Sequence, residues 1–323
     1  MLDKAFIQRL AEKVLGGYKL GFDEAQRLLF TKEFTTLTEC ANTITRENCG
    51  EVVDVEVLIN AKSGGCPEDC SFCSQSSFYY TDIHKYPLLS SEVIVERAKR
   101  AKESGSKSFC LVGAYRTPSD IDFDKICESI VQVKSKVGID VNVSLGFMTM
   151  DRVRKLKAAG VKRYNHNLET CQSLFSAICK THNYQDRINT ARIVKQGGLE
   201  LCCGGIIGLG ENPLQRLELG FSIASLDPDE VPVNILISKK GTPLFNLTPL
   251  HPEDAIRIVS IWRFIMPKTI IKIAGGREVH LKDQERLALN AGANGIITGG
   301  YLTSGGNSAE KDILTIREIG LKT

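Results

Sequence analysis

Three cysteines lie close together in the run Cys66-Pro-Glu-Asp-Cys70-Ser-Phe-Cys73. A C-x3-C-x2-C spacing puts three thiolates on one compact loop, which suits a cubane iron–sulfur cluster with one iron left without a protein ligand. A structural zinc ion normally takes a closed set of four ligands, and the nearest candidate for a fourth is His84. The spacing therefore favours a 4Fe-4S cluster whose open iron can bind a further molecule.

The number and setting of the cysteines agree with metal ligation. The chain of 323 residues has 11 cysteines, and charged residues interrupt its first 20 positions, so the apolar core of a signal peptide is missing. We therefore expect a cytoplasmic protein. In that reducing compartment an odd number of cysteines argues against a disulfide framework and for metal or cluster ligation.

Composition and charge exclude several classes of protein. Apolar residues make up 42% of the chain and charged residues 24%, which is ordinary for a globular protein and unlike disordered, collagenous or coiled-coil chains. The net charge is +3, with no block of like charge, so we expect no nucleic-acid partner. The longest uncharged stretch, 287–309, contains six glycines, which argues against a membrane span.

Short apolar runs alternate with segments of helical period along most of the chain. The predicted strands are 55–60, 108–112, 141–145, 164–168, 199–206, 231–237, 270–273 and 295–298. The predicted helices between and after them are 91–104, 119–138, 151–160, 184–196, 213–226, 252–266, 282–290 and 309–320, and the helical N-terminal part includes 22–30 and 32–43. This order predicts an α/β fold, a (β/α)8 TIM-type barrel over 51–323 with a short helical extension over 1–50. A doubly wound sheet is the alternative.

The barrel prediction places the cysteines. Active sites of such barrels lie at the carboxyl ends of the strands, and the loop with Cys66, Cys70 and Cys73 directly follows the first strand. Cys110 on the second strand and Cys202 on the fifth are candidates for the barrel interior, because alternate strand residues point inward. Most other cysteines are isolated and are interpreted as small apolar fillers or surface thiols: Cys40, Cys49, Cys127 and Cys179.

The cysteine spacing, with Phe72 before the last cysteine, resembles the S-adenosylmethionine radical superfamily, in which the open iron chelates S-adenosylmethionine. Further segments resemble one family within it, biotin synthase, in order and along nearly the whole chain: CPEDC at 66–70, YNHNLET at 164–170, GGIIGLGE at 204–211, VPVN at 231–234, GTP at 241–243 and AGGRE at 274–278. The resemblance implies a radical S-adenosylmethionine sulfurtransferase that converts dethiobiotin to biotin with sulfur from an auxiliary iron–sulfur cluster. The alternatives are a related barrel, such as a hydrogenase-cluster maturase or a methylornithine synthase, and a non-enzymatic iron–sulfur carrier.

The resemblance also implies roles for individual residues. The 4Fe-4S ligands are Cys66, Cys70 and Cys73, and the S-adenosylmethionine site comprises Arg187, Asn167, Glu169, Phe72, Gly113 and Ile206. The dethiobiotin site comprises Asn167, Asn234, Thr303 and Ser304, with Asn234 on the ureido ring and the two hydroxyls on the carboxylate. Glu169 stands where the family usually has an aspartate. Without the resemblance, Asn167 and Asn234 are interpreted as satisfied polar groups inside the barrel, and Arg187 as a solvated arginine.

One part of the chain departs from the family pattern. The family's auxiliary 2Fe-2S cluster is held by three cysteines and one arginine, and at two of those four positions this chain has Asn142 and Lys272, which do not replace a thiolate. An additional Cys203 follows Cys202. We therefore expect a larger auxiliary cluster, of 4Fe type, on Cys110, Cys202 and Cys203. Adjacent strand residues point to opposite faces, so Cys203 reaches inward only if the strand bulges there, and Cys171 is the alternative third thiol.

The resemblance further implies partners. These are a low-potential electron donor such as flavodoxin or ferredoxin, a system that restores sulfide or iron–sulfur units, and a second copy of the chain in a homodimer.

Overall fold

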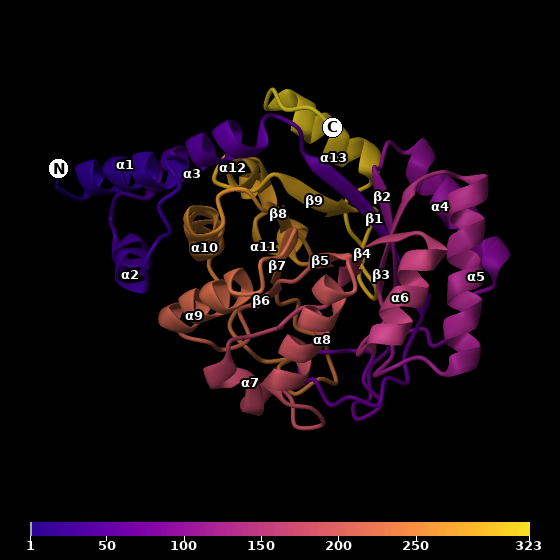
Figure 1. Cartoon of the computed structure of the whole chain (residues 1–323). Coiled ribbons are helices and arrows are strands. Elements are labelled where there is room, and N and C mark those ends of the chain that lie inside the picture. The colour runs from indigo at the N-terminus through magenta and orange to yellow at the C-terminus, as the bar shows by residue number, and fades with distance from the viewer. Residues whose placement is uncertain (1) are drawn as a thin grey trace.

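A closed barrel of parallel strands forms the centre of the computed structural model, which describes residues 2–323 (Figure 1). The strands are β1 (Asp54–Lys62), β2 (Ser108–Gly113), β3 (Asp140–Ser144), β4 (Val161–Asn165), β5 (Glu200–Cys202), β6 (Gly205–Ile207), β7 (Glu230–Ile235), β8 (Ile270–Ile273) and β9 (Gly295–Thr298). Their order in the sheet is β5-β4-β3-β2-β1-β9-β8-β7-β6, and pairing between β5 and β7 closes the barrel. The predicted (β/α)8 barrel is confirmed.

The fifth predicted strand, 199–206, is divided into β5 and β6, so nine labelled strands make eight barrel positions. The interruption falls at Cys203 and Gly204. At Gly204 the backbone passes so close to β7 that a Cβ atom would lie 2.0 Å from the carbonyl oxygen of Pro232. Only glycine allows this approach. At the break the backbone N–H of Cys203 donates to the carbonyl of Glu230 on β7, at 2.9 Å.

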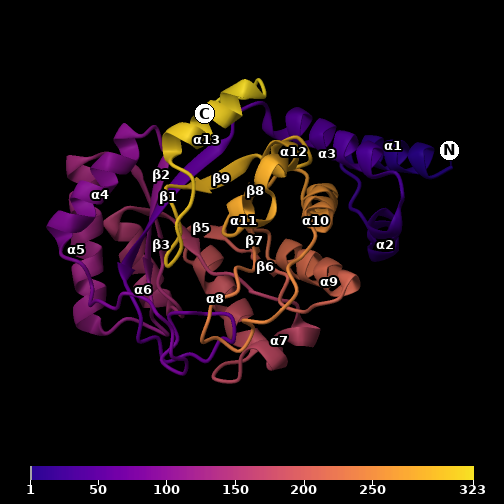
Figure 2. The ribbon, with the colours of Figure 1, turned by 180° about the vertical axis from the view of Figure 1, so that it is seen from behind.

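Helices cover the outside of the barrel (Figures 1 and 2). They are α4 (Ser91–Glu103), α5 (Asp120–Lys136), α6 (Met150–Ala159), α7 (Gln172–Ile178), α8 (Tyr184–Gln196), α9 (Pro213–Ala224), α10 (Pro252–Ile265), α11 (Arg277–His280), a 3₁₀ turn (Lys282–Gln284), α12 (Glu285–Leu289) and α13 (Ala309–Glu318). The sequence did not predict α7, because its seven residues are too few to display a helical period. The predicted helix 282–290 is a 3₁₀ turn followed by the short α12.

Three helices precede the barrel: α1 (Leu2–Leu15), α2 (Phe22–Phe30) and α3 (Phe34–Cys49). They lie on the side of the barrel that carries α10, where Thr45 donates a hydrogen bond to the carbonyl of Gly292 (3.2 Å) and Arg257 donates to that of Thr31 (2.9 Å). The predicted boundary at residue 50 falls between α3 and β1.

Within residues 2–323, no helix combines the length and the apolar character needed to cross a membrane.

Candidate active site

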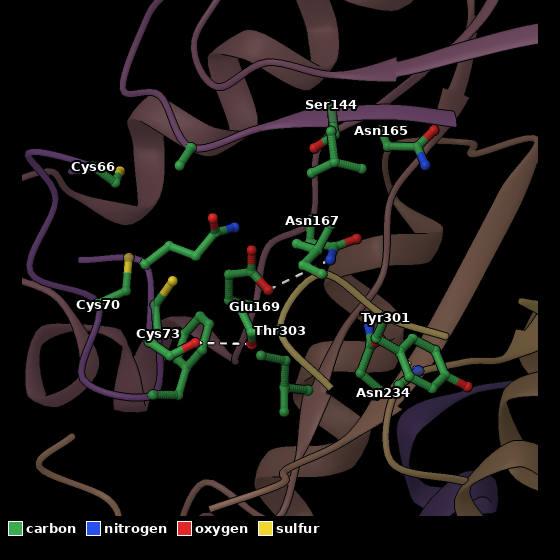
Figure 3. Close-up of a pocket in the computed structure, with 18 of the residues that line it drawn as sticks. Cys66, Cys70, Cys73, Ser144, Asn165, Asn167, Glu169, Asn234, Tyr301 and Thr303 are labelled. Carbon is green, nitrogen blue, oxygen red and sulfur yellow. Dashed lines mark hydrogen bonds between the residues drawn. The ribbon is translucent and has the colours of Figure 1, made fainter. Parts of the chain in front are cut away.

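One cavity of about 400 Å³ opens at the carboxyl ends of the strands and reaches down into the barrel (Figure 3). Most of the predicted site residues line it: Cys66, Cys70, Phe72, Cys73, Cys110, Gly113, Asn167, Glu169, Arg187, Ile206, Asn234, Thr303 and Ser304. We call residues 66–73, which carry Cys66, Cys70 and Cys73, the cysteine loop. We call the part of the cavity at Glu56 and Cys110 the inner end. The structure thus brings together side chains that are far apart in the sequence.

The cysteine loop is held in shape by its own backbone. The N–H of Cys66 donates to the carbonyl of Gln75 at 3.0 Å, and the N–H of Cys73 donates to that of Cys70 at 2.9 Å. Burial raises the pKa of Cys66, and it raises the pKa of Cys73 to about 11. Three sheltered thiols on one loop, all lining the same cavity, fit a 4Fe-4S cluster with one iron facing that cavity.

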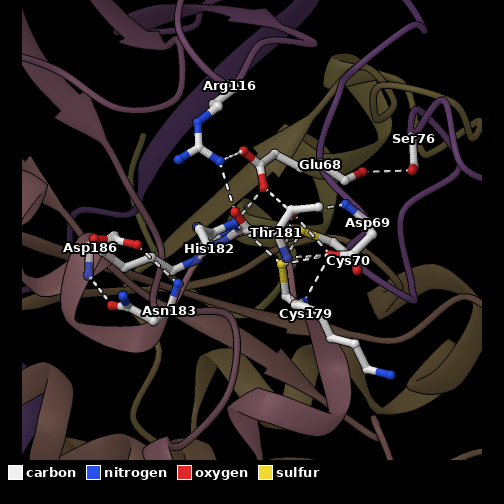
Figure 4. Close-up of polar contacts among 12 residues, drawn as sticks. Glu68, Asp69, Cys70, Ser76, Arg116, Cys179, Thr181, His182, Asn183 and Asp186 are labelled. Carbon is white, nitrogen blue, oxygen red and sulfur yellow. Dashed lines mark hydrogen bonds and ion pairs between the residues drawn. The ribbon is translucent and has the colours of Figure 1, made fainter.

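A fourth cysteine lies directly behind this loop (Figure 4). The sulfur of Cys179 is 3.9 Å from that of Cys70 and 3.2 Å from Nδ1 of His182. The ligand atoms of Cys70, Cys179 and His182 all lie within 4.8 Å of one another. The imidazole that approaches the loop is therefore that of His182, whereas His84 is exposed. Sequence reasoning interpreted Cys179 as a filler, because nothing local marks a contact across 109 positions.

A chain of polar contacts then orients Arg187. The carboxylate of Glu68 accepts a hydrogen bond from Nδ1 of His182 at 2.6 Å, which leaves Nε2 to accept from Nε of Arg187 at 3.0 Å. Burial opposes the charge on Arg187, but Glu169 and the sulfur of Cys70 outweigh it and raise the pKa of the guanidinium. Nη2 of Arg187 lies 3.9 Å from the sulfur of Cys70, so this cation faces the cysteine loop.

The predicted S-adenosylmethionine residues meet on the segment that follows β4. Nη1 of Arg187 donates to the carbonyl of Asn167 at 3.0 Å and lies 3.4 Å from Oε1 of Glu169. Glu169 has a φ of 66°, a left-handed conformation that is strained for glutamate. Its carbonyl accepts the N–H of Ile206 at 2.7 Å, which holds the strained residue in place. This conformation bends the backbone of the segment that carries the predicted site residues Asn167 and Glu169.

The predicted dethiobiotin residues also line the cavity. Asn234 donates through Nδ2 to the carbonyl of Gly205 (3.1 Å) and accepts through Oδ1 from the N–H of Gly275 (3.0 Å). A primary amide has two N–H donors and two acceptor lone pairs, so one of each is left for a ligand. The hydroxyl of Thr303 is 2.9 Å from that of Ser74, which joins the last loop of the barrel to the segment after Cys73.

Sequence reasoning missed one cation in this part of the cavity. Nζ of Lys239 donates to the carbonyl of Thr303 at 3.2 Å, and the side chain lines the cavity beside Thr303 and Ser304. The adjacent Lys240 is exposed and is not part of the lining. An ammonium next to two hydroxyls is a suitable group for a carboxylate. Nothing in the sequence distinguishes one lysine of the pair from the other.

Charged side chains fill the barrel at the inner end, and sequence reasoning missed these as well. Nζ of Lys272 bonds three carboxylates: Asp54 Oδ1 at 2.8 Å, Glu56 Oε2 at 2.8 Å and Glu230 Oε2 at 2.7 Å. Arg163 pairs with the same Glu230 and with Glu200. Lys272, Glu56 and Glu230 are each no more than 1% exposed, so the centre of the network is buried. Among these charged residues, the family resemblance singled out only Lys272. Its partners lie on other strands, and no local sequence pattern connects them to it.

Two thiols share this inner end. Burial raises the pKa of both Cys110 and Cys202, and the carboxylates of Glu56 and Glu230 raise both further. Nδ2 of Asn165 lies 3.5 Å from the sulfur of Cys110, and Asn165 is paired in register with Cys202. The same neighbours therefore surround both sulfurs, as inward alternation on β2 and β5 predicts.

Cys203 has different neighbours. Burial raises its pKa to about 12, and the next largest contribution comes from Glu169 rather than from the carboxylates of the inner end. Cys203 is part of the apolar core, and both it and Cys171 raise the pKa of Tyr184 on α8. The structure does not bring Cys203 to the other two thiols as the sequence prediction required, because it follows Cys202 directly and points to the opposite face. Cys171, the alternative, lies on the same outer side.

Two family models together match most of the chain. One, described as "Radical SAM superfamily", matches residues 61–219, and the other, described as "Biotin and Thiamin Synthesis associated domain", matches residues 232–322.

Curated relatives match over nearly their full length. The biotin synthase of Nitrosopumilus maritimus (strain SCM1) is 51% identical over 320 residues, which is 98% of this chain and 98% of that protein. The biotin synthase of Cenarchaeum symbiosum (strain A) is 48% identical over 316 residues, or 98% of this chain and 99% of that protein.

Solved structures share the fold at lower identity. A methylornithine synthase has a TM-score of 0.84 at 24% identity, covering 97% of this chain and 96% of its own. The FeFe-hydrogenase maturase from Carboxydothermus hydrogenoformans has a TM-score of 0.83 at 20% identity, covering 99% of this chain and 79% of its own. At these identities the likeness supports the barrel fold alone.

Proposed function

This chain belongs to the biotin synthase family, and we propose that it inserts sulfur into dethiobiotin to form biotin by radical S-adenosylmethionine chemistry. The observation that carries the proposal is that one cavity joins the cysteine loop to Asn234, Thr303 and Lys239. When bound to the loop, a reduced 4Fe-4S cluster supplies the electron that cleaves S-adenosylmethionine to a 5′-deoxyadenosyl radical.

We propose that the segment after β4 positions S-adenosylmethionine. Arg187 is held by His182 and by the carbonyl of Asn167, so its guanidinium is fixed in place before a ligand carboxylate binds. The carboxylate of Glu169 is available to hydroxyls of the ribose. Phe72, Gly113 and Ile206 line the same part of the cavity and are proposed to enclose the adenosyl group.

Dethiobiotin is proposed to bind between Asn234 and the loop that carries Thr303 and Ser304. The remaining N–H and lone pair of Asn234 suit a ureido group, which has both a carbonyl and N–H donors. Lys239, with the hydroxyls of Thr303 and Ser304, suits the carboxylate at the other end of the substrate. Asn167 lies between the two ligands and is proposed to contact both.

An auxiliary iron–sulfur group at the inner end is proposed as the source of the sulfur atom. Support comes from Cys110, a buried thiol that lines the cavity, and from Cys202, a buried thiol beside the carboxylates of Glu56 and Glu230. That this group is of 4Fe type stays a prediction. A low-potential electron donor such as flavodoxin or ferredoxin, a system that restores sulfide, a homodimeric state and a cytoplasmic location are likewise proposed.

Anaerobic turnover tests this function. Reconstituted protein with S-adenosylmethionine, dethiobiotin and a strong reductant is expected to form both 5′-deoxyadenosine and biotin. If 5′-deoxyadenosine forms but dethiobiotin neither binds nor reacts, the chain acts on another substrate, as a maturase or methylornithine synthase does. If no 5′-deoxyadenosine forms, an iron–sulfur carrier is the better assignment.

A further inference from the structure

The inner end has lost the nitrogen ligand that the family pattern places at Lys272. An ammonium group has three N–H donors and no lone pair. Nζ of Lys272 donates to Oε2 of Glu56 at 2.8 Å and forms ion pairs with Asp54 and Glu230 at 2.8 and 2.7 Å. These carboxylates also hold the lysine in its charged form, since removing its proton would leave them unpaired in a buried site. Lys272 is therefore a counter-ion for carboxylates and is not free to bind iron.

The strand-three position is occupied as well. Nδ2 of Asn142 donates to Oε1 of Glu56 at 2.6 Å, and the side chain is fully buried. Asn142 thus belongs to the same network as Lys272. Of the four positions that hold the auxiliary cluster in the family, only those of Cys110 and Cys202 present sulfur to the interior.

The inner end nevertheless has the features of a binding site. Among residues 2–323, several buried side-chain oxygens have no hydrogen-bond partner, and four of them lie on this network or beside its thiols: Oδ1 of Asp54, Oδ1 of Asn142, Oδ1 of Asn165 and Oε1 of Glu230. Asn142 and Glu230 are 0% exposed. Acceptors without donors, next to two thiols, are what remains when a positively charged or hydrogen-bond-donating group is absent. The cavity reaches this point, because Glu56, Cys110 and Asn165 line it.

We infer that the inner end binds an iron–sulfur group through two thiolates, Cys110 and Cys202, and through no third cysteine. This inference rests on the proposed function and refines it, since it names the ligands of the sulfur-donating group. Cys203 is excluded because it follows Cys202 directly, so its side chain leaves the opposite face of the chain and packs in the apolar core, which also holds Cys171. Turning Cys203 inward would move Gly204, which packs against Pro232 of β7 and whose amide donates to Oδ1 of Asn167 at 3.0 Å. The predicted S-adenosylmethionine site would be disturbed at the same time.

Iron and sulfide counts on single cysteine variants test the inference. The full chain is reconstituted anaerobically as wild type, Cys110→Ala, Cys202→Ala, Cys203→Ala and Cys171→Ala. The outer 4Fe-4S cluster is quantified by its electron paramagnetic resonance signal. Its iron is subtracted from the total iron, and the remainder is the auxiliary iron. Wild type, Cys203→Ala and Cys171→Ala are expected to retain the same auxiliary iron and sulfide, whereas Cys110→Ala and Cys202→Ala lose essentially all of it. Cys110→Ser and Cys202→Ser, which preserve side-chain size, serve if an alanine variant does not fold.

Two results would overturn the inference. If Cys203→Ala or Cys171→Ala loses as much auxiliary iron as Cys110→Ala, a third thiolate is present. If wild type holds no iron beyond the outer cluster, the inner end is not an iron site. Biotin formation is measured on the same samples. Wild type that shows the expected iron pattern but forms no biotin contradicts the proposed function and leaves the ligand assignment standing.

Discussion

The two groups of buried thiols in this barrel have opposite electrostatic surroundings. At the cysteine loop, the sulfur of Cys70 faces the guanidinium of Arg187 and the thiol of Cys179, both at 3.9 Å. At the inner end, Cys110 and Cys202 face the carboxylates of Glu56 and Glu230, which raise the pKa of both thiols. The cysteine loop therefore faces a cation, which lowers the pKa of Cys70 against the effect of burial, whereas the two inner thiols face anions.

This difference indicates how each site depends on its metal. A thiolate is the form that binds iron, and nearby cations and donors stabilise it whether or not iron is present. At the inner end Lys272 and Arg163 lower the pKa of the thiols, but burial and the carboxylates outweigh them, so bound iron would have to stabilise the thiolates there. We therefore expect the outer cluster to assemble more readily than the inner group. The following predictions test this contrast, beginning with the largest effect.

Removing a ligand of the outer cluster should abolish its chemistry. Cys70→Ala is expected to form no 5′-deoxyadenosine under reducing anaerobic conditions, because a cubane held by two thiolates loses the site-differentiated iron. The control is Cys127→Ala, on the outer face of α5. A Cys70→Ala variant that cleaves S-adenosylmethionine at the wild-type rate would falsify the ligand assignment.

The charge network at the inner end should be a large contributor to stability. Lys272→Met leaves Glu56 and Asp54 without their counter-ion and Glu230 with Arg163 alone. Breaking a buried pair in this way costs about 3–5 kcal/mol. Urea denaturation measures the loss. Lys322→Met is the matched control, because its pair with Glu51 has side chains 70% and 57% exposed and is worth at most about 1 kcal/mol. Equal losses in the two variants would contradict a buried network.

Asn234 lies between the two thiol sites and should affect substrate binding alone. Loss of its amide leaves polar atoms of the ureido group unpaired, at a cost on the order of 1–3 kcal/mol. Calorimetric titration of Asn234→Ala with dethiobiotin is expected to show this loss, with S-adenosylmethionine binding unchanged. An unaltered dethiobiotin affinity would rule out the proposed contact.

The lysine pair after β7 offers a test of the substrate carboxylate. Lys239→Met is expected to weaken dethiobiotin binding by about 1 kcal/mol, roughly fivefold in Kd, because a half-buried cation next to Thr303 is lost. Lys240→Met should have no effect. The difference between the two variants should vanish for the methyl ester of dethiobiotin. If the methyl ester shows the same difference in affinity between the two variants as dethiobiotin does, Lys239 does not bind the carboxylate.

The smallest effect should come from Cys179, behind the cysteine loop. In the structure the thiol of Cys70 donates to the sulfur of Cys179. Once Cys70 binds iron as a thiolate it has no proton to give, so Cys179 becomes the donor of this contact, and such a bond favours the more negative, reduced cluster. Cys179→Ala is therefore expected to lower the reduction potential of the outer cluster by an amount on the order of tens of millivolts. Redox titration followed by electron paramagnetic resonance measures this, with Cys127→Ala as the reference. A potential that is unchanged or higher would show that no such hydrogen bond forms.

Much of the fold and the outer site could be predicted from the sequence, because the relevant signals are local. Cys66, Cys70 and Cys73 lie within a few residues of one another, so their spacing alone brings their thiols to one loop. The strands and helices of the barrel each carry their own apolar period, and α8 (Tyr184–Gln196) has the predicted bounds. The sequence predicted the break between β5 and β6 only as a possible bulge at Cys203.

Contacts that depend on strand register were decided by the tertiary structure. Lys272 meets Glu56 and Glu230 because β1, β7 and β8 place these residues at one level of a closed barrel, and no local pattern records that level. Cys179 reaches Cys70 across the mouth of the barrel in the same way. The sequence by itself determined which side chains could bind iron. Only the packing of distant strands decided which of them share a site and which charges surround them, because burial and charge act through space rather than along the chain.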